Sequence, residues 1–546
     1  MKKALVYMFV LLSINAWAQE LNTVQKAMRD ELERSMKDLK SDGFEKPFFI
    51  NYTLLDETSV QMTATLGALM SSVETQGRAA LSIRLLVGDY EFNDESLDNN
   101  LFSPPQANEI NLPLDDDYMG IRRSLWVSTD NVYRNASRQY ARNREMLKEQ
   151  NKPLSDLPHR SFLKVAPSKI DIDGAEVKFD KAATEDYIRK VSAVFGEYKQ
   201  IENSNVGFFY RRGYRYLMNS EGSVNRIPVS LVTLAIGAGF RTPEGEFIFD
   251  NIQHSYLTPE LPPLDTIIAE TKAMAEAMIA SSEAPVFREE YTGPVMFAGQ
   301  QTAQLFVSQL FTGEDNLIAN NNIQNLKGFR YETSASMDTK IGKPVFAETM
   351  TVKAHPKLKK YGETTLLGSF EADDEGVVPA DETVLIENGV LKALMNDRTM
   401  VKAGQVANGL GDGPGVVSIT FKTTSSAVDL KAKLIAHAKA EGLEFALVVR
   451  GSTAMGGGRM VDVYKVYVAD GREELVRLAS MKDVSQRDFK KISGASKETG
   501  VYHVTRAGQI TSVICPEAVI LDEIEFTGSN LPTLKDEEYV PSPLKK

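Results

Sequence analysis

The stretch of residues 293–311, GPVMFAGQQTAQLFVSQLF, constrains the fold more than any other part of the sequence. Val295, Met296 and Phe297 form a short apolar run, which predicts a buried strand. After Gly299, apolar side chains recur at roughly helical spacing, which predicts a helix with one face in a core. A strand that leads directly into a helix is a common frame for a catalytic site.

A second stretch, residues 368–392 (GSFEADDEGVVPADETVLIENGVLK), predicts a turn rich in carboxylates and then a β-hairpin. Asn388-Gly389 lies between two apolar runs, and Asn-Gly in that position is the strongest short-range hairpin signal in a sequence. The turn could bind a hard cation through carboxylate oxygens or contact a peptide in a cavity, although a solvated turn is the simpler interpretation. Its candidate residues are Asp373, Asp374, Glu375 and Gly376.

These two stretches resemble the C-terminal half of the TldD/PmbA proteins, a peptidase family once described as modulators of DNA gyrase. Three further segments are similar to the same family and follow in its order: VGDYEF at 87–92, NSEG at 219–222, and VYKVY at 463–467, which leads into DGREELV at 470–476. The resemblance covers most of the chain. It implies an α+β protein, with an N-terminal domain of a helix plus an antiparallel sheet and a β-rich C-terminal domain of rolled-sheet or barrel-like form.

The resemblance also implies a zinc site that this sequence does not complete. TldD-type members carry HExxxH on the helix of the first stretch, where two imidazoles bind zinc and the Glu acts as a base, and a Cys further along the chain completes the site. The corresponding segment here contains neither His nor Glu, and a Gln side chain is a weak, neutral donor that does not replace an imidazole. The segment consists of Gln300, Gln301, Thr302, Ala303, Gln304, Leu305, Phe306, Val307, Ser308, Gln309, Leu310 and Phe311.

Cys515 is the one cysteine of the chain, and it lies in the apolar sequence VICP at 513–516. A lone Cys in such surroundings is much more often a small core residue than a metal ligand. We therefore expect no catalytic residue and no metal or other cofactor in this chain, and zinc only in a TldD-type partner. A single cysteine also excludes an intrachain disulfide, so that stability must come from packing.

Residues 1–18 have the pattern of a bacterial secretory signal peptide. Two lysines precede an apolar run at 4–12, and AWA at 16–18 forms a small-x-small cleavage site. We expect cleavage after Ala18 and a periplasmic or secreted protein. No other apolar run approaches the ~20 residues of a membrane-spanning helix, so we expect no permanent membrane segment.

The chain is acidic along its whole length. The formal net charge is -12, and removal of the two lysines of the signal peptide makes it more negative by two. An evenly acidic surface repels the phosphates of nucleic acid, and we find no basic stripe that would attract them. A role on DNA therefore has no physical support in the sequence.

The pattern of elements divides the chain into the signal peptide at 1–18, an N-terminal α+β domain at 19–285, a C-terminal domain at 286–535 and a loose tail at 536–546. In the N-terminal domain, an amphipathic helix at 21–39 precedes a meander of four strands with a turn at Gln76-Gly77-Arg78. We expect a turn at 219–222, where Gly222 can supply a positive φ. Further helices are predicted at 125–152, 184–197, 264–281 and 430–441.

Other charged groups have simpler interpretations than a functional site. Asp115-Asp116-Asp117 is typical of a solvated loop. An arginine cluster could hold a peptide carboxylate, but pairing with neighbouring acids is the simpler interpretation. None of the five histidines has a His or Cys partner at ligand spacing, and no GxSxG or GxxxxGK[ST] motif signals a serine hydrolase or a phosphate-binding loop. The arginines are Arg134, Arg138, Arg142 and Arg144.

Members of the family of the PmbA type lack HExxxH and pair with a TldD-type subunit, and the two enclose a cavity in which short or unfolded peptides are cut. The resemblance therefore implies that this chain is the non-catalytic subunit of an exported zinc peptidase. Its sheet edges could hold an extended peptide by strand addition. A stand-alone peptide-binding or scaffold homodimer is the main alternative, and an active hydrolase that uses another metal is a third.

Overall fold

The computed structural model describes residues 21–40, 43–97, 110–151, 153–157, 159–175, 177–242, 247–312, 316–319, 337–402, 404–455, 458–506 and 509–528. The predicted signal peptide at 1–18 and the predicted tail at 536–546 lie outside these residues. Among the described helices, none has both the length and the apolar character that crossing a membrane requires.

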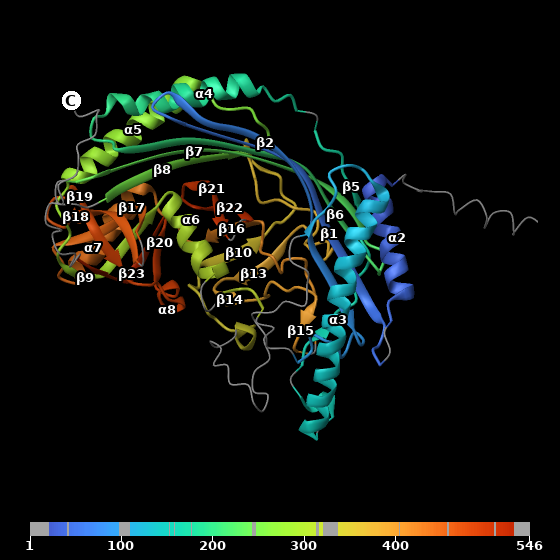
Figure 1. Cartoon of the computed structure of the whole chain (residues 1–546). Helices are drawn as coiled ribbons and strands as arrows, with labels where there is room; N and C mark the ends of the chain where they lie inside the picture. Colours follow the sequence, from blue (N-terminus) through green and yellow to red (C-terminus); the bar gives the residue numbers. More distant parts are fainter. Residues whose placement is uncertain are drawn as a thin grey trace, which may run out of the picture.

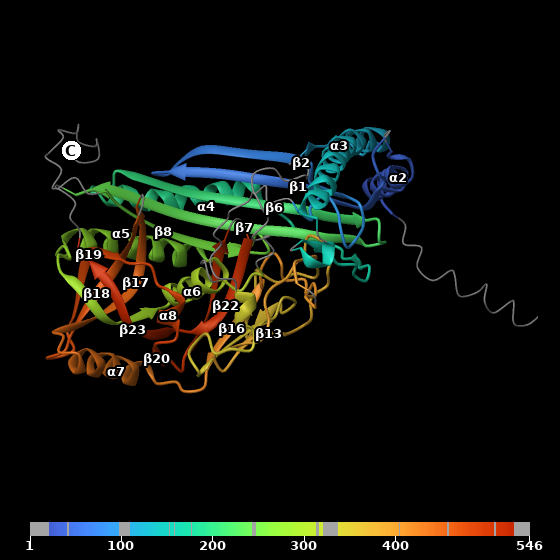
Figure 2. The ribbon, with the colours of Figure 1, turned by 90° about the horizontal axis from the view of Figure 1, so that it is seen from below.

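The N-terminal part is built on one large sheet of long strands. The strand order is β3, β2, β1, β6, β7 and β5, with β8 also paired to β7, and every neighbouring pair except β5 and β7 is antiparallel. Figures 1 and 2 show this sheet arching over the C-terminal part. Its strands are β1 (Pro47–Thr65), β2 (Ala68–Val87), β3 (Ile110–Asn111), β5 (Lys169–Asp171), β6 (Asn203–Asn219), β7 (Val224–Arg241) and β8 (Phe247–Tyr256).

The predicted four-strand meander is wrong, because β1 and β2 are two continuous strands joined by a turn at Leu66-Gly67. Both turn residues have positive φ, 47° and 82°, and the Gly67 N–H donates to Ser192 Oγ at 3.0 Å. The predicted turn at 76–78 lies inside β2, where Arg78 pairs across to Asp56 of β1. At Gly77, pairing with β1 overrides the local preference of glycine for turns.

Two pairs of helices cover one face of this sheet. Even-numbered residues of β1 from Ile50 to Leu54 pack against α2 and α3, and those from Val60 to Ala64 pack against α4 and α5. The helices predicted in this part are confirmed, with ends set by capping: an Asn22–Gln25 capping box begins α2, and Asp117 accepts hydrogen bonds at the start of α3. The helices are α2 (Thr23–Asp38), α3 (Tyr118–Gln150), α4 (Lys181–Ala193), followed by a 3-10 turn at Val194–Glu197, and α5 (Leu264–Glu283).

The C-terminal part contains two six-stranded sheets that share one apolar core. The first has the order β14, β13, β10, β16, β22, β21, and the second β19, β18, β17, β9, β23, β20. This arrangement and the helical layers confirm the α+β fold class. The strands are β9 (Glu290–Ala298), β10 (Met350–Ala354), β13 (Thr383–Glu387), β14 (Val390–Leu391), β16 (Val416–Phe421), β17 (Phe445–Met455), β18 (Gly458–Tyr467), β19 (Glu473–Met481), β20 (Ile492–Ala495), β21 (Thr499–Arg506), β22 (Gln509–Pro516) and β23 (Ala518–Thr527).

Local sequence signals placed several elements of this part correctly. The Asn388-Gly389 hairpin is confirmed, with φ of 53° and 77° joining β13 to β14. The predicted helix at 430–441 is α7, which packs on the outer side of β9, β17 and β23. The helices are α6 (Gln300–Val307), continued by a π-helical turn at Ser308–Thr312, α7 (Ala427–Ala440) and α8 (Gln486–Phe489).

Short strands link distant segments. β15 (Thr399–Met400), from the C-terminal part, pairs with β4 (Ser161–Phe162), from the N-terminal part. This pairing lies beside the acidic turn described below and joins the two halves of the chain directly. A separate two-stranded ladder is formed by β11 (Lys360–Tyr361) and β12 (Thr364–Thr365).

The outer edge of β2 carries no strand partner over much of its length. β3 pairs with β2 only at Ala79 and Ala80, and no described strand pairs with the outer side from Ala68 to Gly77. Met70 and Val73 in this stretch are exposed. An edge of this length, without proline or lysine, can accept another strand through its backbone N–H and C=O groups.

Candidate functional site

The strand-to-helix unit singled out in the sequence is present as β9, Gly299 and α6. Gly299 has a φ of 62°, a value that favours glycine, and its N–H donates to Glu517 O at 2.7 Å. This bond ties the start of α6 to the turn between β22 and β23. The helix then runs back between the two sheets of the C-terminal part, in contact with β9, β17, β21 and β22.

The side chains of α6 and the following turn are used for packing and for backbone hydrogen bonds. The Gln300 amide donates to His503 O at 3.0 Å, and the Thr302 hydroxyl lies 2.9 Å from Phe297 O. Ser308 Oγ donates to Leu305 O at 2.9 Å. The apolar members are buried in the shared core, as the helical periodicity predicted: Ala303, Leu305, Phe306, Val307, Leu310 and Phe311.

The donor set around α6 does not fit zinc. A catalytic zinc site needs three protein ligands of the His, Cys or carboxylate type, and α6 offers amides, hydroxyls and hydrocarbon. Within the described ranges, no three His, Cys, Asp or Glu side chains are arranged to hold a metal ion. Cys515 on β22 is fully buried in the apolar core, and burial raises the pKa of its thiol well above the usual range. A thiol in that environment does not readily become the thiolate that binds metals.

Each of the five histidines contacts a hydroxyl, a backbone carbonyl or a carboxylate. His355 Nε2 lies 2.8 Å from Ser418 Oγ, and His503 Nδ1 lies 3.0 Å from Ser512 Oγ. Burial lowers the pKa of both imidazoles. The other three contact Leu157 O (His159), Glu270 (His254), and Glu441 and Asp522 (His437).

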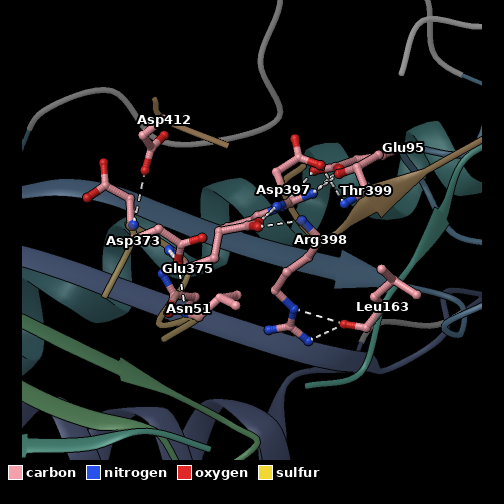
Figure 3. Close-up of polar contacts among 12 residues, drawn as sticks. Asn51, Glu95, Leu163, Asp373, Glu375, Asp397, Arg398, Thr399 and Asp412 are labelled. Atoms are coloured by element: carbon pink, nitrogen blue, oxygen red, sulfur yellow. Dashed lines mark hydrogen bonds and ion pairs between the residues drawn. The ribbon is translucent and has the colours of Figure 1, made fainter. Parts of the chain in front are cut away.

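The acidic turn predicted at 373–376 docks on the N-terminal sheet. The Asp373 side chain is inside this turn, only 5% exposed, and its Oδ1 accepts the N–H groups of Glu375 at 3.0 Å and Val377 at 2.8 Å (Figure 3). Burial, together with the nearby Glu375 carboxylate, raises the pKa of Asp373 to about 8. Gly376 has a φ of 79° and lies against Leu217 of β6.

The other two acids of the turn pair with arginines of the N-terminal sheet. Glu375 forms an ion pair with Arg84 of β2, and its second oxygen accepts the backbone N–H of Arg398 at 2.8 Å. Asp374 is half exposed and pairs with Arg215 of β6. The structure therefore brings all four predicted residues of this turn to the contact between the two halves of the chain. A contact between them and a peptide stays a prediction.

Arg398 is the centre of this contact, and sequence reasoning missed it. Its side chain is fully buried and donates to Leu163 O at 2.8 and 2.6 Å (Figure 3). It also donates to Glu221 at 2.8 Å. The guanidinium also lies over the rings of Phe49 and Phe162, at 4.8 and 4.1 Å from their centroids. Glu221 belongs to the NSEG segment, whose predicted turn is confirmed between β6 and β7. The family-like segment was therefore the one sequence signal that pointed here.

Further acids make this region, which we call the acidic junction, rich in negative charge. Burial raises the pKa of Asp397 and Glu375 and raises that of Asp412 to about 6. Burial opposes the charged form of Arg84, but the carboxylates of Glu95 and Glu375 outweigh it, so the pKa of Arg84 is raised. Apart from Glu375 in the predicted acidic turn, these groups come from other segments, and no local pattern marks them. The acidic junction comprises Arg84, Glu95, Arg215, Glu221, Asp373, Asp374, Glu375, Asp397, Arg398 and Asp412.

Several of the remaining charged candidates have structural partners. Arg134 pairs with Asp130 one turn earlier on α3, and Arg144 pairs with Glu45, as the simpler interpretation of the arginine cluster predicted. Asp116 pairs with Arg78. Together with the capping role of Asp117, this pairing gives two of the three acids before α3 a structural role.

Comparison with known families covers the C-terminal part. Residues 294–528 match the family model of the PmbA/TldA metallopeptidase C-terminal domain. The match begins within β9 and ends just after β23, so it spans both six-stranded sheets and α6. No curated protein matches the chain.

Three solved structures are similar to nearly the whole chain. A Thermotoga maritima protein named as a proposed modulator of a DNA gyrase is 13% identical with a TM-score of 0.58, covering 92% of this chain and 100% of that one. TldE from Thermococcus kodakarensis is 13% identical with a TM-score of 0.54 and the same coverage. A Bacteroides thetaiotaomicron protein, also named as a proposed modulator of DNA gyrase, is 11% identical with a TM-score of 0.59, covering 92% of this chain and 99% of that one. At these identities, the likeness establishes the fold.

Proposed function

We propose that this chain, whose residues 294–528 match the PmbA/TldA metallopeptidase C-terminal domain, is the non-catalytic subunit of an exported zinc peptidase. In this complex a TldD-type partner carries the zinc and cuts short or unfolded peptides. This chain supplies part of the cavity wall and backbone contacts to the peptide. The signal-peptide pattern at 1–18 supports export to a periplasm-like compartment.

The observation that carries this proposal is the donor chemistry of α6. The helix on which the family's catalytic members place HExxxH has Gln300 bonded to a backbone carbonyl and Thr302 bonded to two others. Its remaining side chains are largely buried in hydrocarbon. A zinc ion would have to displace these contacts and would still meet neutral amide donors, which bind it weakly. The chain's own residues therefore favour a binding role over a catalytic one.

The free edge of β2 supports a role in contacting an extended chain. Over residues 68–77, the outer N–H and C=O groups have no described strand partner. A peptide that adds as a strand makes main-chain hydrogen bonds, which depend little on sequence. This mode suits a peptidase complex that acts on many short or unfolded peptides.

The test compares the mature chain alone with the same chain mixed with an HExxxH-bearing family member from the same cell. We expect less than stoichiometric zinc and no peptide cleavage for the isolated chain. The mixture should form a stable complex that holds zinc and cleaves unfolded peptides. Tight stoichiometric zinc together with peptide cleavage by the isolated chain would overturn the proposal.

A peptide-binding or scaffold homodimer is the second candidate, and the exposed β2 edge also favours it. Two copies could pair through this edge and extend the sheet. Analytical ultracentrifugation separates the candidates: the homodimer predicts self-association that persists when the HExxxH-bearing partner is added. The peptidase complex predicts exchange into a heteromer.

Export has its own test. Expression of the full-length chain in a Gram-negative host, followed by fractionation and N-terminal sequencing, should recover a periplasmic protein that begins at Gln19. Recovery of the uncut chain from the cytoplasm would contradict export. The proposed peptide-binding role would still be decided by the zinc, cleavage and sedimentation experiments described above.

A further inference from the structure

Asp373 is a buried acid without a cationic partner at a contact between two halves of the chain. Its Oδ1 accepts two backbone N–H groups of its own turn, at 3.0 and 2.8 Å. No described lysine or arginine pairs with it, whereas both neighbouring acids, Asp374 and Glu375, have arginine partners. A carboxyl group in such surroundings favours its neutral form, because burial penalises the charge and no cation offsets it.

The charged groups around Asp373 leave an excess of acid. Its own turn contributes Asp374 and Glu375, and the loop at 404–415 contributes Asp412, whose Oδ2 accepts the Asp374 N–H at 3.2 Å (Figure 3). The three arginines of the acidic junction are each engaged elsewhere. Arg84 pairs with Glu95 and Glu375, Arg215 with Asp374, and Arg398 with Glu221, while Asp397 accepts the Thr399 N–H.

The turn that holds Asp373 is one of the contacts that dock the C-terminal part on the N-terminal sheet. Besides the two ion pairs, Arg215 Nη2 donates to Ala372 O at 3.1 Å, and Gly376 packs against Leu217 and Ser168. Release of the turn from β2 and β6 would bring water to the Asp373 carboxyl. The burial of the Asp373 carboxyl is therefore coupled to the docking of this turn on the N-terminal sheet.

We propose that the acidic junction is a proton-operated latch: a proton on Asp373 keeps the turn docked on the N-terminal sheet, and loss of that proton favours release. In the docked state, burial and the Glu375 carboxylate raise the pKa of Asp373 to about 8. In the released state, the carboxyl is in water, and its pKa returns to about 3.9. The docked state binds the proton more tightly, so docking is strongest at low pH, weakens as the pH rises through neutrality, and weakens no further above a pH of about 8.

The size of the effect follows from one proton. Between a pH of about 5 and about 7.5, the ratio of released to docked molecules rises about tenfold per pH unit, which gives roughly 50-fold from pH 6 to pH 8. Asp412, with its pKa raised to about 6, shifts the ratio in the same direction, mainly below pH 6. Arg84 stays charged throughout this range. In an exported protein the latch would follow the pH of the surroundings, and this consequence alone rests on the proposed function.

Hydrogen exchange followed by mass spectrometry tests the latch on the full mature chain between pH 6 and pH 9. After correction for the intrinsic pH dependence of exchange, we expect opening at residues 371–377 and at the β4–β15 pair to increase about tenfold per pH unit up to about 8. Asp373→Asn keeps the acceptor oxygen and removes the titration, so its slope should be flat above pH 6.5. Asp381→Asn is the matched control, because the Asp381 side chain is 89% exposed, and it should keep the wild-type slope.

Opening that does not change between pH 6 and pH 8 in the wild type, or an unchanged slope in Asp373→Asn, would overturn the latch. If Asp373→Asn does not fold, urea unfolding of the wild type decides the matter. The urea concentration at the midpoint of unfolding must then decrease as the pH is raised from 6 to 8, and it must stay constant above a pH of about 8. A midpoint urea concentration that stays constant or increases between pH 6 and pH 8 rejects the proposal. Neither readout involves zinc or peptide cleavage, so failure of the latch leaves the proposed function untouched.

Discussion

The α6 segment and the acidic junction use polar side chains in opposite ways. Along α6 the polar groups are neutral, and Gln300 and Thr302 donate to backbone carbonyls. At the acidic junction, buried charges from distant segments meet, with Arg398 fully enclosed. The helix that the family resemblance predicts at the position of HExxxH is here a packing element. The charge that can respond to solution conditions lies instead where the two halves of the chain dock.

The difference shows which of the two regions can respond to a change in pH. A buried neutral network fixes one arrangement, because each donor has a partner and no group titrates near neutral pH. In a buried cluster with more acids than arginines, carboxyl groups can gain or lose protons as the pH changes. Substitutions should therefore affect the two regions differently, and the experiments below are ordered from the largest expected effect to the smallest.

Arg398→Ala should cost the most stability, about 4–5 kcal/mol, because it leaves Glu221 buried and unpaired and removes both bonds to Leu163 O. Urea unfolding measures the loss. Arg450→Ala is the control, since Arg450 is 42% exposed in its pair with Glu473, and it should change stability by less than about 1 kcal/mol. Equal stability losses for the two substitutions would mean that the buried contacts of Arg398 stabilise the protein no more than an exposed ion pair does.

Phe306→Ala should follow, with a loss of about 3–4 kcal/mol, because it opens a cavity next to Phe421 and Phe489 in the shared core. Its unfolding free energy should not depend on pH any more than that of the wild type. Val428→Ala, at a side chain 79% exposed on α7, is the control and should be nearly neutral. A loss below about 1 kcal/mol for Phe306→Ala would show that α6 is not part of the core.

Thr302→Val probes the neutral network itself. The change keeps the shape of the side chain and removes the hydroxyl that donates to Phe297 O, so we expect a loss of about 1 kcal/mol. Thr302→Ser keeps the hydroxyl and should retain most of that contribution. Thermal unfolding at pH 6 and at pH 8 should give the same difference between the two variants. If the difference in stability between the two variants changed with pH, the α6 network would not differ from the acidic junction in its response to pH.

The smallest effect is expected at Cys515, where the folded protein should not react at all. Burial raises the pKa of this thiol, so a reagent that needs the thiolate should find none in the native state. Ellman's reagent should give no colour with the folded chain at pH 8 and one equivalent of thiol in concentrated urea. Rapid reaction of the folded chain would place Cys515 in an accessible, polar environment, contrary to its place in the core.

Features encoded by neighbouring residues were predictable from the sequence. The strand, glycine and helix at 293–311 and the Asn388-Gly389 hairpin depend on periodicity and on the φ preferences of single residues. The helices predicted at 21–39 and 264–281 likewise appear as α2 and α5, with ends shifted by no more than two residues. The family resemblance supplied the fold class, which propensity alone does not.

Features set by contacts between distant segments were not predictable. The turn at Leu66-Gly67 is fixed by the long pairing of β1 with β2 and by docking on Ser192, whereas Gly77 has the sequence pattern of a turn and lies in mid-strand. The acidic junction was not predicted for the same reason, because Arg84 and Arg398 lie outside the DDEG turn in the sequence. Only the acids of that turn and the NSEG segment carried a signal.

The contacts of Arg84 with Glu375 and of Arg398 with Leu163 span 291 and 235 residues of sequence. Loop closure over such distances is slow, while the β1–β2 hairpin can form as soon as both strands exist. Until the C-terminal part is present, Arg84 of β2 and Arg215 of β6 lack their partners Glu375 and Asp374. These long-range contacts can close only after the C-terminal half has been made, so the N-terminal sheet is fully covered only in the completed chain.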